Sequence, residues 1–172
     1  MELTIRPITV EDNAEIAAII RAALKEFGAD RPGTVYYDDT TDHLFELFQE
    51  QGSTYFIAES GNRIIGGAGI YPTKGLPAGC CELVKMYLSP DARGKGLGKQ
   101  LISLCLRTAA DLGYSHVYLE TMPELKKALS VYEKFGFKYL EGPLGDSGHF
   151  GCGMWMLLDL SRDYFVKTAE EI

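Results

Sequence analysis

The segment from Glu82 to Gln100, ELVKMYLSPDARGKGLGKQ, constrains the fold more than any other part of this chain. Its first seven residues have the length and the mixture of apolar and aromatic side chains that indicate a buried strand. Pro90 has no N–H for a strand ladder, and the Ser-Pro-Asp cluster around it indicates a turn. Beyond the turn, apolar residues recur at helical spacing at Leu97, Leu101, Leu104, Cys105 and Leu112. The segment is therefore predicted to form a strand, a glycine-rich turn and the start of a helix.

Three glycines occupy every second position of this turn: Gly94, Gly96 and Gly98. Because glycine has no Cβ atom, the amides of the first helical turn can converge on an anion, which the helix dipole and flanking cations also favour. A phosphate group is the ligand that this arrangement predicts. A Walker loop is excluded because Gln100 follows Lys99, where that motif needs Ser or Thr. A dinucleotide-binding turn stays open as an alternative, since Glu120 ends the next predicted strand near the place of a ribose-binding acid.

Two blocks of sequence resemble the GNAT superfamily of acetyl-CoA-dependent N-acetyltransferases. The turn from Arg93 to Gly98 reads Arg-Gly-x-Gly-x-Gly, which is similar to the pyrophosphate loop of that family. The stretch from Ala128 to Phe137, ALSVYEKFGF, is similar to the family's late helix and lies at the family's separation from the turn. Outside these blocks the resemblance extends over about Thr4 to Leu160 through the order of predicted elements alone.

The resemblance implies an α/β fold, an α+β sandwich whose mixed, mostly antiparallel central sheet has helices on both faces. It also implies acetyl-CoA as the cosubstrate. The residues expected around its pyrophosphate, mostly through backbone amides, are Arg93, Gly94, Lys95, Gly96, Leu97, Gly98 and Lys99. Main-chain groups of Met86, Tyr87 and Leu88 are expected to pair with its pantetheine arm. One departure is Leu125, which stands where many family members carry an Asn that contacts the cofactor, so this contact must be absent or replaced.

Acetylation of an amine needs a base, because an alkyl ammonium group has a pKa of about 10.4. The resemblance places this base at Glu82, whose pKa of about 4.3 is expected to rise on burial. A solvated strand-end glutamate or an ion-pair partner of Lys85 is the structural alternative, and His116 and His149 are reserve bases. The resemblance also makes Tyr132 the acid that protonates the departing thiolate. A core aromatic residue is the alternative there, and a packed ring with a hydroxyl in the site satisfies both.

The loop from Ala29 to Thr40 is rich in aromatic and acidic residues, and in the family this region often borders the acceptor site. The candidates for acceptor contacts in this loop are Tyr36, Tyr37, Asp38 and Asp39. Packed tyrosines and helix-capping aspartates are an equally good explanation of the same residues. His149 is a further candidate for substrate binding.

The formal net charge of −7 argues against a nucleic-acid partner, since duplex binding relies on basic surfaces. Locally the balance reverses, with five basic residues and one acidic residue from Lys85 to Arg107, which suits a polyanionic cofactor. The first residues carry no leader-like pattern and no apolar run reaches membrane-spanning length, so a cytoplasmic protein without membrane contact is expected. A homodimer is an expectation from family habit alone.

The cysteines are predicted to be reduced and buried, because none of the four forms a Cys-x-x-Cys pair: Cys80, Cys81, Cys105 and Cys152. No metal is expected. A nucleophile–base pair of Cys152 and His149, or a metal site that includes Cys80 and Cys81, has no spacing signature to support it.

Residues 1–160 are predicted to form one N-acetyltransferase domain and residues 161–172 a short C-terminal tail. Strands are predicted at 2–6, 54–59, 64–71, 82–88, 116–121, 137–140 and 150–158, and helices at 9–27, 43–48, 97–112 and 123–135. Glycines at positions 66, 67 and 69 indicate a bulge or a close backbone contact. Alternation along the strand that begins at Glu82 places Val84, Met86 and Leu88 on one face and Leu83, Lys85 and Tyr87 on the other.

The function predicted from the sequence is direct transfer of an acetyl group from acetyl-CoA to a primary amine of a small molecule or an amino-acid-like acceptor. No covalent acyl-enzyme is expected. The alternatives are an acetyltransferase for protein or peptide amines and an acetyl-CoA-binding module without catalysis.

Overall fold

The computed structural model describes residues 2–161 and 164–165. These residues form a seven-stranded sheet in the order β1-β2-β3-β4-β5-β7-β6, in which the β4–β5 pair is parallel and the other pairs are antiparallel. The strands are β1 (Leu3–Pro7), β2 (Thr54–Ser60), β3 (Arg63–Tyr71), β4 (Cys80–Leu88), β5 (His116–Thr121), β6 (Lys138–Leu140) and β7 (Met154–Asp159). The helices are α1 (Asn13–Glu26), α2 (Leu44–Leu47), α3 (Leu97–Asp111) and α4 (Lys126–Phe135), with short 3-10 turns at Val10–Asp12, Val35–Tyr37, Asp39–Asp42 and Pro90–Ala92. The predicted mixed, mostly antiparallel sheet is confirmed.

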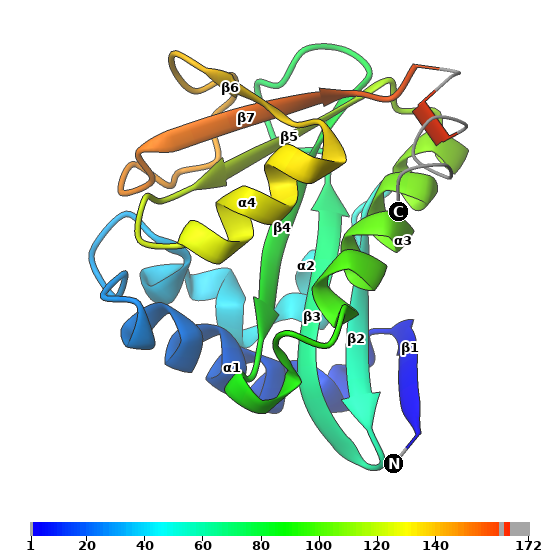
Figure 1. Ribbon diagram of the computed structural model, residues 1–172, viewed down its shortest axis with the longest axis vertical. Helices are drawn as coiled ribbons and strands as arrows, with labels where there is room; N and C mark the ends of the chain where they lie inside the picture. Colours follow the sequence, from blue (N-terminus) through cyan, green and yellow to red (C-terminus); the bar gives the residue numbers. More distant parts are fainter. Residues whose placement is uncertain (1, 162–163, 166–172) are drawn as a thin grey trace.

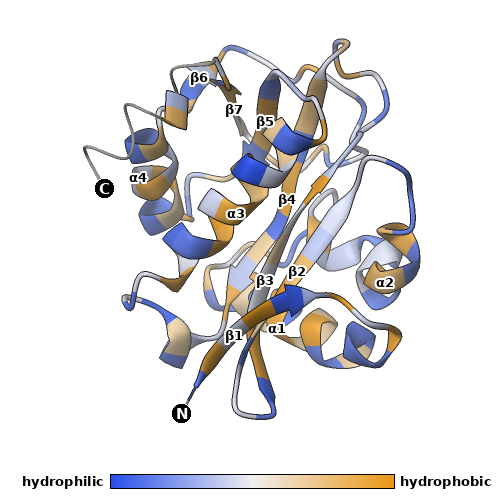
Figure 2. Ribbon diagram, turned by 90° about the vertical axis from the view of Figure 1, so that its right-hand side faces the viewer, coloured by the Kyte–Doolittle hydropathy of each residue, from blue (hydrophilic) through white to orange (hydrophobic). Residues whose placement is uncertain are grey.

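The helices cover both faces of the sheet, with α1 and α2 on one face and α3 and α4 on the other (Figure 2). Each pair buries its own apolar cluster. Ile16, Ile20 and Leu24 of α1 pack on Tyr55 and Ile57 of β2. On the opposite face, the α3 residues Leu101, Ile102, Cys105 and Leu106 pack with Leu83, Val117 and Leu119. The sheet is therefore the middle layer of three, as the sequence predicted.

The parallel strands β4 and β5 stay together over a short length only. Their paired residues are Cys80–Glu82 and His116–Tyr118. Beyond Glu82 the two strands diverge, and Figure 1 shows β5 turning away from β4 together with β7 and β6. Among the described residues, no strand consequently pairs with the edge of β4 that faces β5 from Leu83 to Leu88.

Strand β4 carries a bulge at Lys85, whose backbone φ is +50°. Val84 pairs with Gly69 and Tyr87 with Gly67, so β4 has one residue more than β3 over this interval. The buried Tyr55 hydroxyl donates a hydrogen bond to the Lys85 carbonyl oxygen at 2.8 Å, which holds the bulge in place. A bulge or a close contact was predicted at these β3 glycines, and both occur, because a Cβ on Gly67 would lie 2.6 Å from the Tyr55 ring.

The extra residue corrects the predicted alternation of side chains in β4. Leu83 lies on the α3 face with Met86 and Leu88, whereas Val84 lies on the α1 face with Tyr87. The prediction of Val84 with Met86 and Leu88 was wrong because it assumed an uninterrupted period of two.

Several predicted boundaries also change. The chain after Thr9 first makes a 3-10 turn, although Asp12 closes the predicted capping box by accepting the Thr9 amide at 2.7 Å. Helix α4 begins at Lys126, three residues after Pro123. Strand β7 begins at Met154, and residues 150–153 belong to a loop, because the Gly151 amide donates to the Gly33 carbonyl oxygen at 2.7 Å instead of to a strand. Much of the predicted tail lies outside the described residues, so the domain boundary at residue 160 stays a prediction.

Candidate active site

The glycine-rich turn before α3 has the predicted open form. Gly94 and Gly96 have φ of +73° and +79°, and nothing lies within 4 Å of a Cβ built on either residue. Gly98 is needed for packing, because a Cβ there would lie 3.0 Å from the Met86 side chain. The first hydrogen bond inside α3 is donated by the Gln100 amide to Gly96 at 3.1 Å. The amides that precede it are left for another acceptor, as in an anion site at a helix N-terminus.

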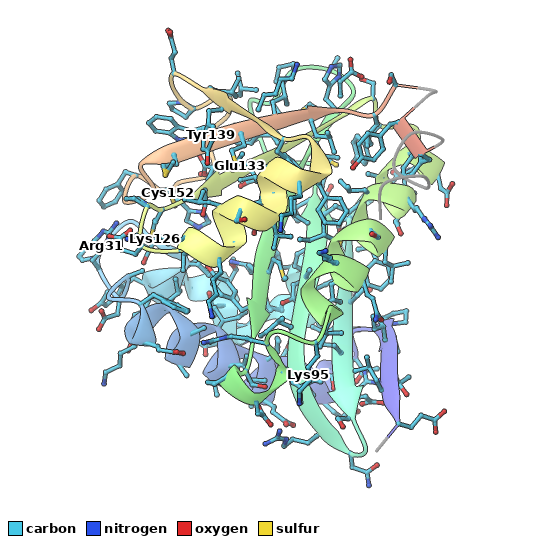
Figure 3. The ribbon with its side chains drawn as sticks, viewed as in Figure 1. Arg31, Lys95, Lys126, Glu133, Tyr139 and Cys152 are labelled. Carbon is cyan, nitrogen blue, oxygen red and sulfur yellow. The ribbon has the colours of Figure 1, made fainter. Side chains whose placement is uncertain are left out.

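The cations around the turn have different surroundings. The Arg93 guanidinium donates to the Leu88 carbonyl oxygen at 3.0 and 3.2 Å, pairs with Glu26 at 2.8 Å and lies over the Phe27 ring. Arg93 therefore braces the end of β4, while Leu97 is buried with 3% exposure and offers its backbone alone. Lys95 lies on the turn and Lys126 at the start of α4 (Figure 3). Lys126 is one of the residues that sequence reasoning missed.

A cleft of about 500 Å³ runs from this turn into the gap between β4 and β5. At one end it is lined by Gly94, Gly96, Gly98, Lys99 and the residues Met86, Tyr87 and Leu88. At the other end it is lined by Glu82, Glu120, His149 and Cys152, and Tyr132 and Lys126 contribute from α4. The structure therefore brings most of the predicted cofactor and catalytic residues into one space.

Glu82 is 3% exposed and lies on the wall of this cleft, at the point where β4 and β5 separate. Burial raises its pKa to about 7, while a hydrogen bond from the Thr73 hydroxyl at 2.6 Å opposes the rise and the nearby charge of Glu120 adds to it. The Thr73 bond goes to Oε1, and Oε2 receives no hydrogen bond from a described residue. A carboxyl group with this pKa can accept a proton near neutral pH.

Tyr132 projects from α4 into the same cleft and is 8% exposed. Its ring packs against Phe137 with 5.9 Å between ring centroids. Burial raises the pKa of the Tyr132 hydroxyl, which keeps it protonated at neutral pH. The packed ring agrees with the core aromatic residue that the sequence also allowed, and the part of the hydroxyl in the reaction stays a prediction.

Asp38 connects three separate segments on the acceptor side. Its Oδ2 accepts from Lys85 Nζ at 3.1 Å and lies 2.9 Å from His149 Nε2. Burial alone would raise the pKa of Asp38, but the His149 hydrogen bond and the Lys85 charge hold it below its usual range. Burial also lowers the pKa of Lys85, against the effect of Asp38.

Asp38 and the other acceptor candidates of the loop all lie outside the lining of the cleft, although Asp38 contacts His149, which lines it. Tyr37 is 60% exposed, and Tyr36 packs against it with 5.1 Å between ring centroids. Asp39 is exposed at the start of a 3-10 turn. Of this group, Asp38 is the residue that the fold brings next to the predicted His149. The reserve base His116 lies at the paired end of β5, where its ring is 4.0 Å from Asp159.

Sequence reasoning missed Thr73 and Glu120 as acceptor-side residues. Tyr118 and Ser147 hold the Glu120 carboxylate, with the Tyr118 hydroxyl 2.9 Å from Oε2 and the Ser147 hydroxyl on Oε1. The sequence alone indicates that Glu120 and Tyr118 lie on the same face of one strand. That Glu120 comes near Glu82 depends on the order of the strands in the sheet. Thr73 follows β3 and gives no local signal of its role.

In the part of the chain that the structure describes, no group of three or more His, Cys, Asp or Glu side chains is arranged to hold a metal ion. Within the same residues, no helix has the length and apolar character that a bilayer crossing needs. The four cysteines are buried and unpaired, as predicted.

The fold and the cleft are compatible with an enzyme that transfers an acyl group, with an open glycine turn at one end of the cleft and a buried carboxyl group at the other. Residues 9–137 match the model of the acetyltransferase (GNAT) family. Over 157 residues the chain is 39% identical to the uncharacterized N-acetyltransferase YjgM of Escherichia coli (strain K12). The aligned region covers 90% of this chain and 93% of that protein. The chain therefore belongs to the GNAT family of acetyltransferases, as its sequence predicted.

Solved structures of other proteins have the same fold. A GNAT-family acetyltransferase from Staphylococcus aureus Mu50 superimposes with a TM-score of 0.78 at 17% identity, over 92% of this chain and 99% of that one. YncA of Salmonella typhimurium, a putative acetyltransferase solved with its cofactor acetyl-CoA, has a TM-score of 0.74 at 20% identity, over 94% and 96% of the two chains. The predicted class of enzyme, an acetyl-CoA-dependent N-acetyltransferase, is confirmed at the level of the family.

Proposed function

We propose that this chain transfers an acetyl group from acetyl-CoA directly to a primary amine of a small molecule or an amino-acid-like acceptor. The observation that carries the proposal is the continuous cleft that joins the open glycine turn to the buried carboxyl group of Glu82, whose pKa burial raises to about 7. A phosphate-binding end and a proton-accepting end in one cleft are what transfer from a CoA thioester to an amine requires.

The residues that would hold acetyl-CoA lie along β4 and the turn. The amides from Gly94 to Lys99 would receive the pyrophosphate, and Lys95 and Lys99 would offset its charge. The unpaired edge of β4 from Met86 to Leu88 would bond the pantetheine arm as a neighbouring strand does. The fit is supported by the space at Gly94 and Gly96, where a built Cβ has nothing within 4 Å. When bound, acetyl-CoA supplies an activated acetyl group as a thioester.

Glu82 would act on the acceptor. Above its pKa of about 7 the carboxylate can take a proton from the acceptor ammonium, and the resulting amine has the free electron pair that forms the new N–C bond. Thr73 fixes Oε1 and so leaves Oε2 directed to the substrate. Protons taken up by Glu82 pass to solvent through the open cleft.

Tyr132 would act on the departing sulfur. As the C–S bond breaks, the thiolate needs a proton, and a protonated hydroxyl on the cleft wall can donate it. The second proton of the attacking amine restores the hydroxyl, so the amide keeps one proton and the thiol gains one.

Direct transfer is also supported by Cys152, the cysteine that lines the cleft. Burial raises the pKa of its thiol to about 12, and the charges of Glu120 and Glu82 add to the effect. The thiolate needed for an acyl-enzyme is therefore strongly disfavoured at neutral pH.

The proposal is tested by adding acetyl-CoA to the purified protein and following its thermal unfolding, and then by measuring thiol release with a panel of primary amines. We expect stabilisation by acetyl-CoA and turnover of at least one amine. Tyr132→Phe should lower kcat about 100-fold and leave acetyl-CoA binding intact. Tyr139→Phe is the matched control, because Tyr139 is 47% exposed on β6 and bonds to Glu133 away from the cleft (Figure 3). Absence of both binding and turnover, or equal rates in the two variants, would contradict the proposal.

The homodimer and the cytoplasmic location stay predictions, which size-exclusion chromatography and cell fractionation test. The role of Tyr36 and Tyr37 at the acceptor also stays a prediction. His149, which lines the cleft and contacts Asp38, is the better-supported acceptor contact.

A further inference from the structure

The acceptor side of the cleft holds more negative than positive charge. Three carboxyl groups, Asp38, Glu82 and Glu120, lie near the Lys85 ammonium and the His149 ring. Both of these groups contact the same carboxylate, because Lys85 Nζ and His149 Nε2 lie 3.1 and 2.9 Å from Asp38 Oδ2. Among the described residues, neither group is within ion-pair distance of Glu82 or Glu120.

Among the described residues, only uncharged hydroxyl groups donate hydrogen bonds to the side chains of Glu82 and Glu120. Oε1 of Glu82 accepts from the Thr73 hydroxyl, and Glu120 accepts from the hydroxyls of Tyr118 and Ser147. Arg31, at the edge of this region, pairs with Glu124 at 2.8 Å. Within the described residues, no cation lies within ion-pair distance of Glu82 or Glu120.

Geometry places the two glutamates on the same side of the sheet. Tyr118 is the β5 partner of Glu82, and Glu120 follows Tyr118 by two residues, which keeps it on the same face. Both carboxyl groups line the cleft. Thr73 occupies Oε1 of Glu82, and Oε2 receives no hydrogen bond from a described residue, so this oxygen is free to accept from a ligand in the cleft.

A single amine on the acceptor cannot balance both carboxylates throughout the reaction. The reacting ammonium must give a proton to Glu82 before its nitrogen forms a bond to the acetyl carbon. At that stage the amine and Glu82 are both neutral, while Glu120 still carries its charge in a partly buried place. An uncompensated carboxylate in such surroundings is costly, so a cation that does not react is the fitting partner.

We infer that the acceptor carries a second cationic group, and that Glu120 binds this group while Glu82 receives the reacting amine. The acceptor is then a short diamine or a primary amine with another fixed positive charge. The inference rests on the proposed function. It makes Glu120 a specificity-determining residue, whose carboxylate has acceptor sites left after binding two hydroxyls.

Three amines with the same four-methylene chain test the inference: putrescine, n-pentylamine and δ-aminovalerate. They differ at the far end alone, which is an ammonium, a methyl group or a carboxylate. In the wild-type protein we expect kcat/KM for putrescine to exceed that for n-pentylamine about 10-fold or more, with δ-aminovalerate the poorest. In Glu120→Gln the ratio of kcat/KM for putrescine to that for n-pentylamine should fall close to one.

The matched control is Glu141→Gln, which removes an exposed carboxylate from the loop after β6 and should keep the wild-type ratio. The wild-type comparison of the three amines needs no variant, so it decides the question even if Glu120→Gln fails to fold. Equal kcat/KM for putrescine and n-pentylamine, a preference for δ-aminovalerate, or an unchanged ratio in folded Glu120→Gln would overturn the inference and leave the proposed function intact. If acetyl-CoA binds and none of the three amines is acetylated, the inference is wrong and the proposed transfer to small amines loses its support as well.

Discussion

The two ends of the cleft are built in different ways. The donor end comes from one continuous segment, Met86 to Lys99, and it offers mainly backbone groups and the space left by glycines. The acceptor end comes from side chains of five segments that are far apart in the sequence, at Asp38, Thr73, the start of β4, the end of β5 and His149. Backbone binding depends on local conformation, whereas a side-chain constellation depends on the whole fold.

This difference separates the part of the cleft that binds a ligand through its backbone from the part whose specificity depends on individual side chains. A turn that binds through amides accepts one ligand whatever the neighbouring side chains are. An acceptor end made of side chains on loops can change its charges one at a time without disturbing the sheet. Mutations at the two ends should therefore affect different quantities, and the following predictions test that separation from the largest effect to the smallest.

Glu82→Gln should have the largest effect, a loss of about 10²- to 10⁴-fold in kcat/KM, or roughly 3–5 kcal/mol, because the acceptor loses its base. In the wild type, log kcat/KM should rise with pH and level off above the Glu82 pKa of about 7. This acidic limb should vanish in the variant, while the dissociation constant of acetyl-CoA changes little. A wild-type rate in Glu82→Gln would show that the base lies elsewhere.

The same substitution should stabilise the fold at alkaline pH. The pKa of Glu82 is about 7 in the folded chain against a model-peptide value of 4.5, so the folded state keeps a proton that the unfolded state has lost. Stability is therefore lost as pH rises from 4.5 to about 7, and Glu82→Gln should recover up to about 3 kcal/mol near pH 8, at about 1.4 kcal/mol for each pKa unit. Urea unfolding at several pH values measures this, and Glu141→Gln, on the surface, should show no such gain.

Asp38→Asn should destabilise the fold by about 2 kcal/mol, since it leaves the buried Lys85 ammonium without its countercharge. We also expect a higher KM for the amine with an unchanged acetyl-CoA dissociation constant. The adjacent Asp39→Asn is the control, because Asp39 is exposed. Equal unfolding free energies for these two variants would mean that the link between Asp38, Lys85 and His149 contributes nothing.

Gly96→Ala should have the smallest effect, an increase of about 10-fold in the dissociation constant of acetyl-CoA. A Cβ at φ of +79° costs about 1 kcal/mol and moves the amides of the turn. Gly113→Ala carries the same backbone cost at φ of +91°, but it lies beyond the far end of α3. Calorimetric titration should show weaker binding in Gly96→Ala and wild-type binding in Gly113→Ala.

The donor end was predictable from the sequence because its signals are local. The positions of Gly94, Gly96 and Gly98 indicate a turn that needs positive φ and close packing, and the apolar period after Leu97 indicates the helix. The fold class followed from the order of the elements together with the family resemblance. Glu82 and Tyr132 were proposed through that resemblance and their catalytic roles stay predictions, while the structure adds the burial that explains their shifted pKa values.

The acceptor end could not be predicted in the same way. Glu120 and Thr73 reach Glu82 through strand order and loop packing, which no local pattern encodes. The Asp38–His149 contact joins residues 111 positions apart. The bulge at Lys85 was also hidden, since its conformation depends on the hydrogen bond from Tyr55 on another strand.

Because β4 contains one additional residue at its bulge, the position of the glycine turn depends more on the length of this strand than on its composition. Removing Lys85 would remove the bulge and leave a simple alternation, with Met86 and Leu88 still toward α3 and Tyr87 toward α1, but the strand would be one residue shorter. The glycine turn that follows would be drawn toward β5 by one residue's rise, about 3.3 Å, and would no longer meet the end of the gap. We therefore expect relatives that share this site to differ in β4 by substitutions and to keep the number of residues between Glu82 and Gly94 constant.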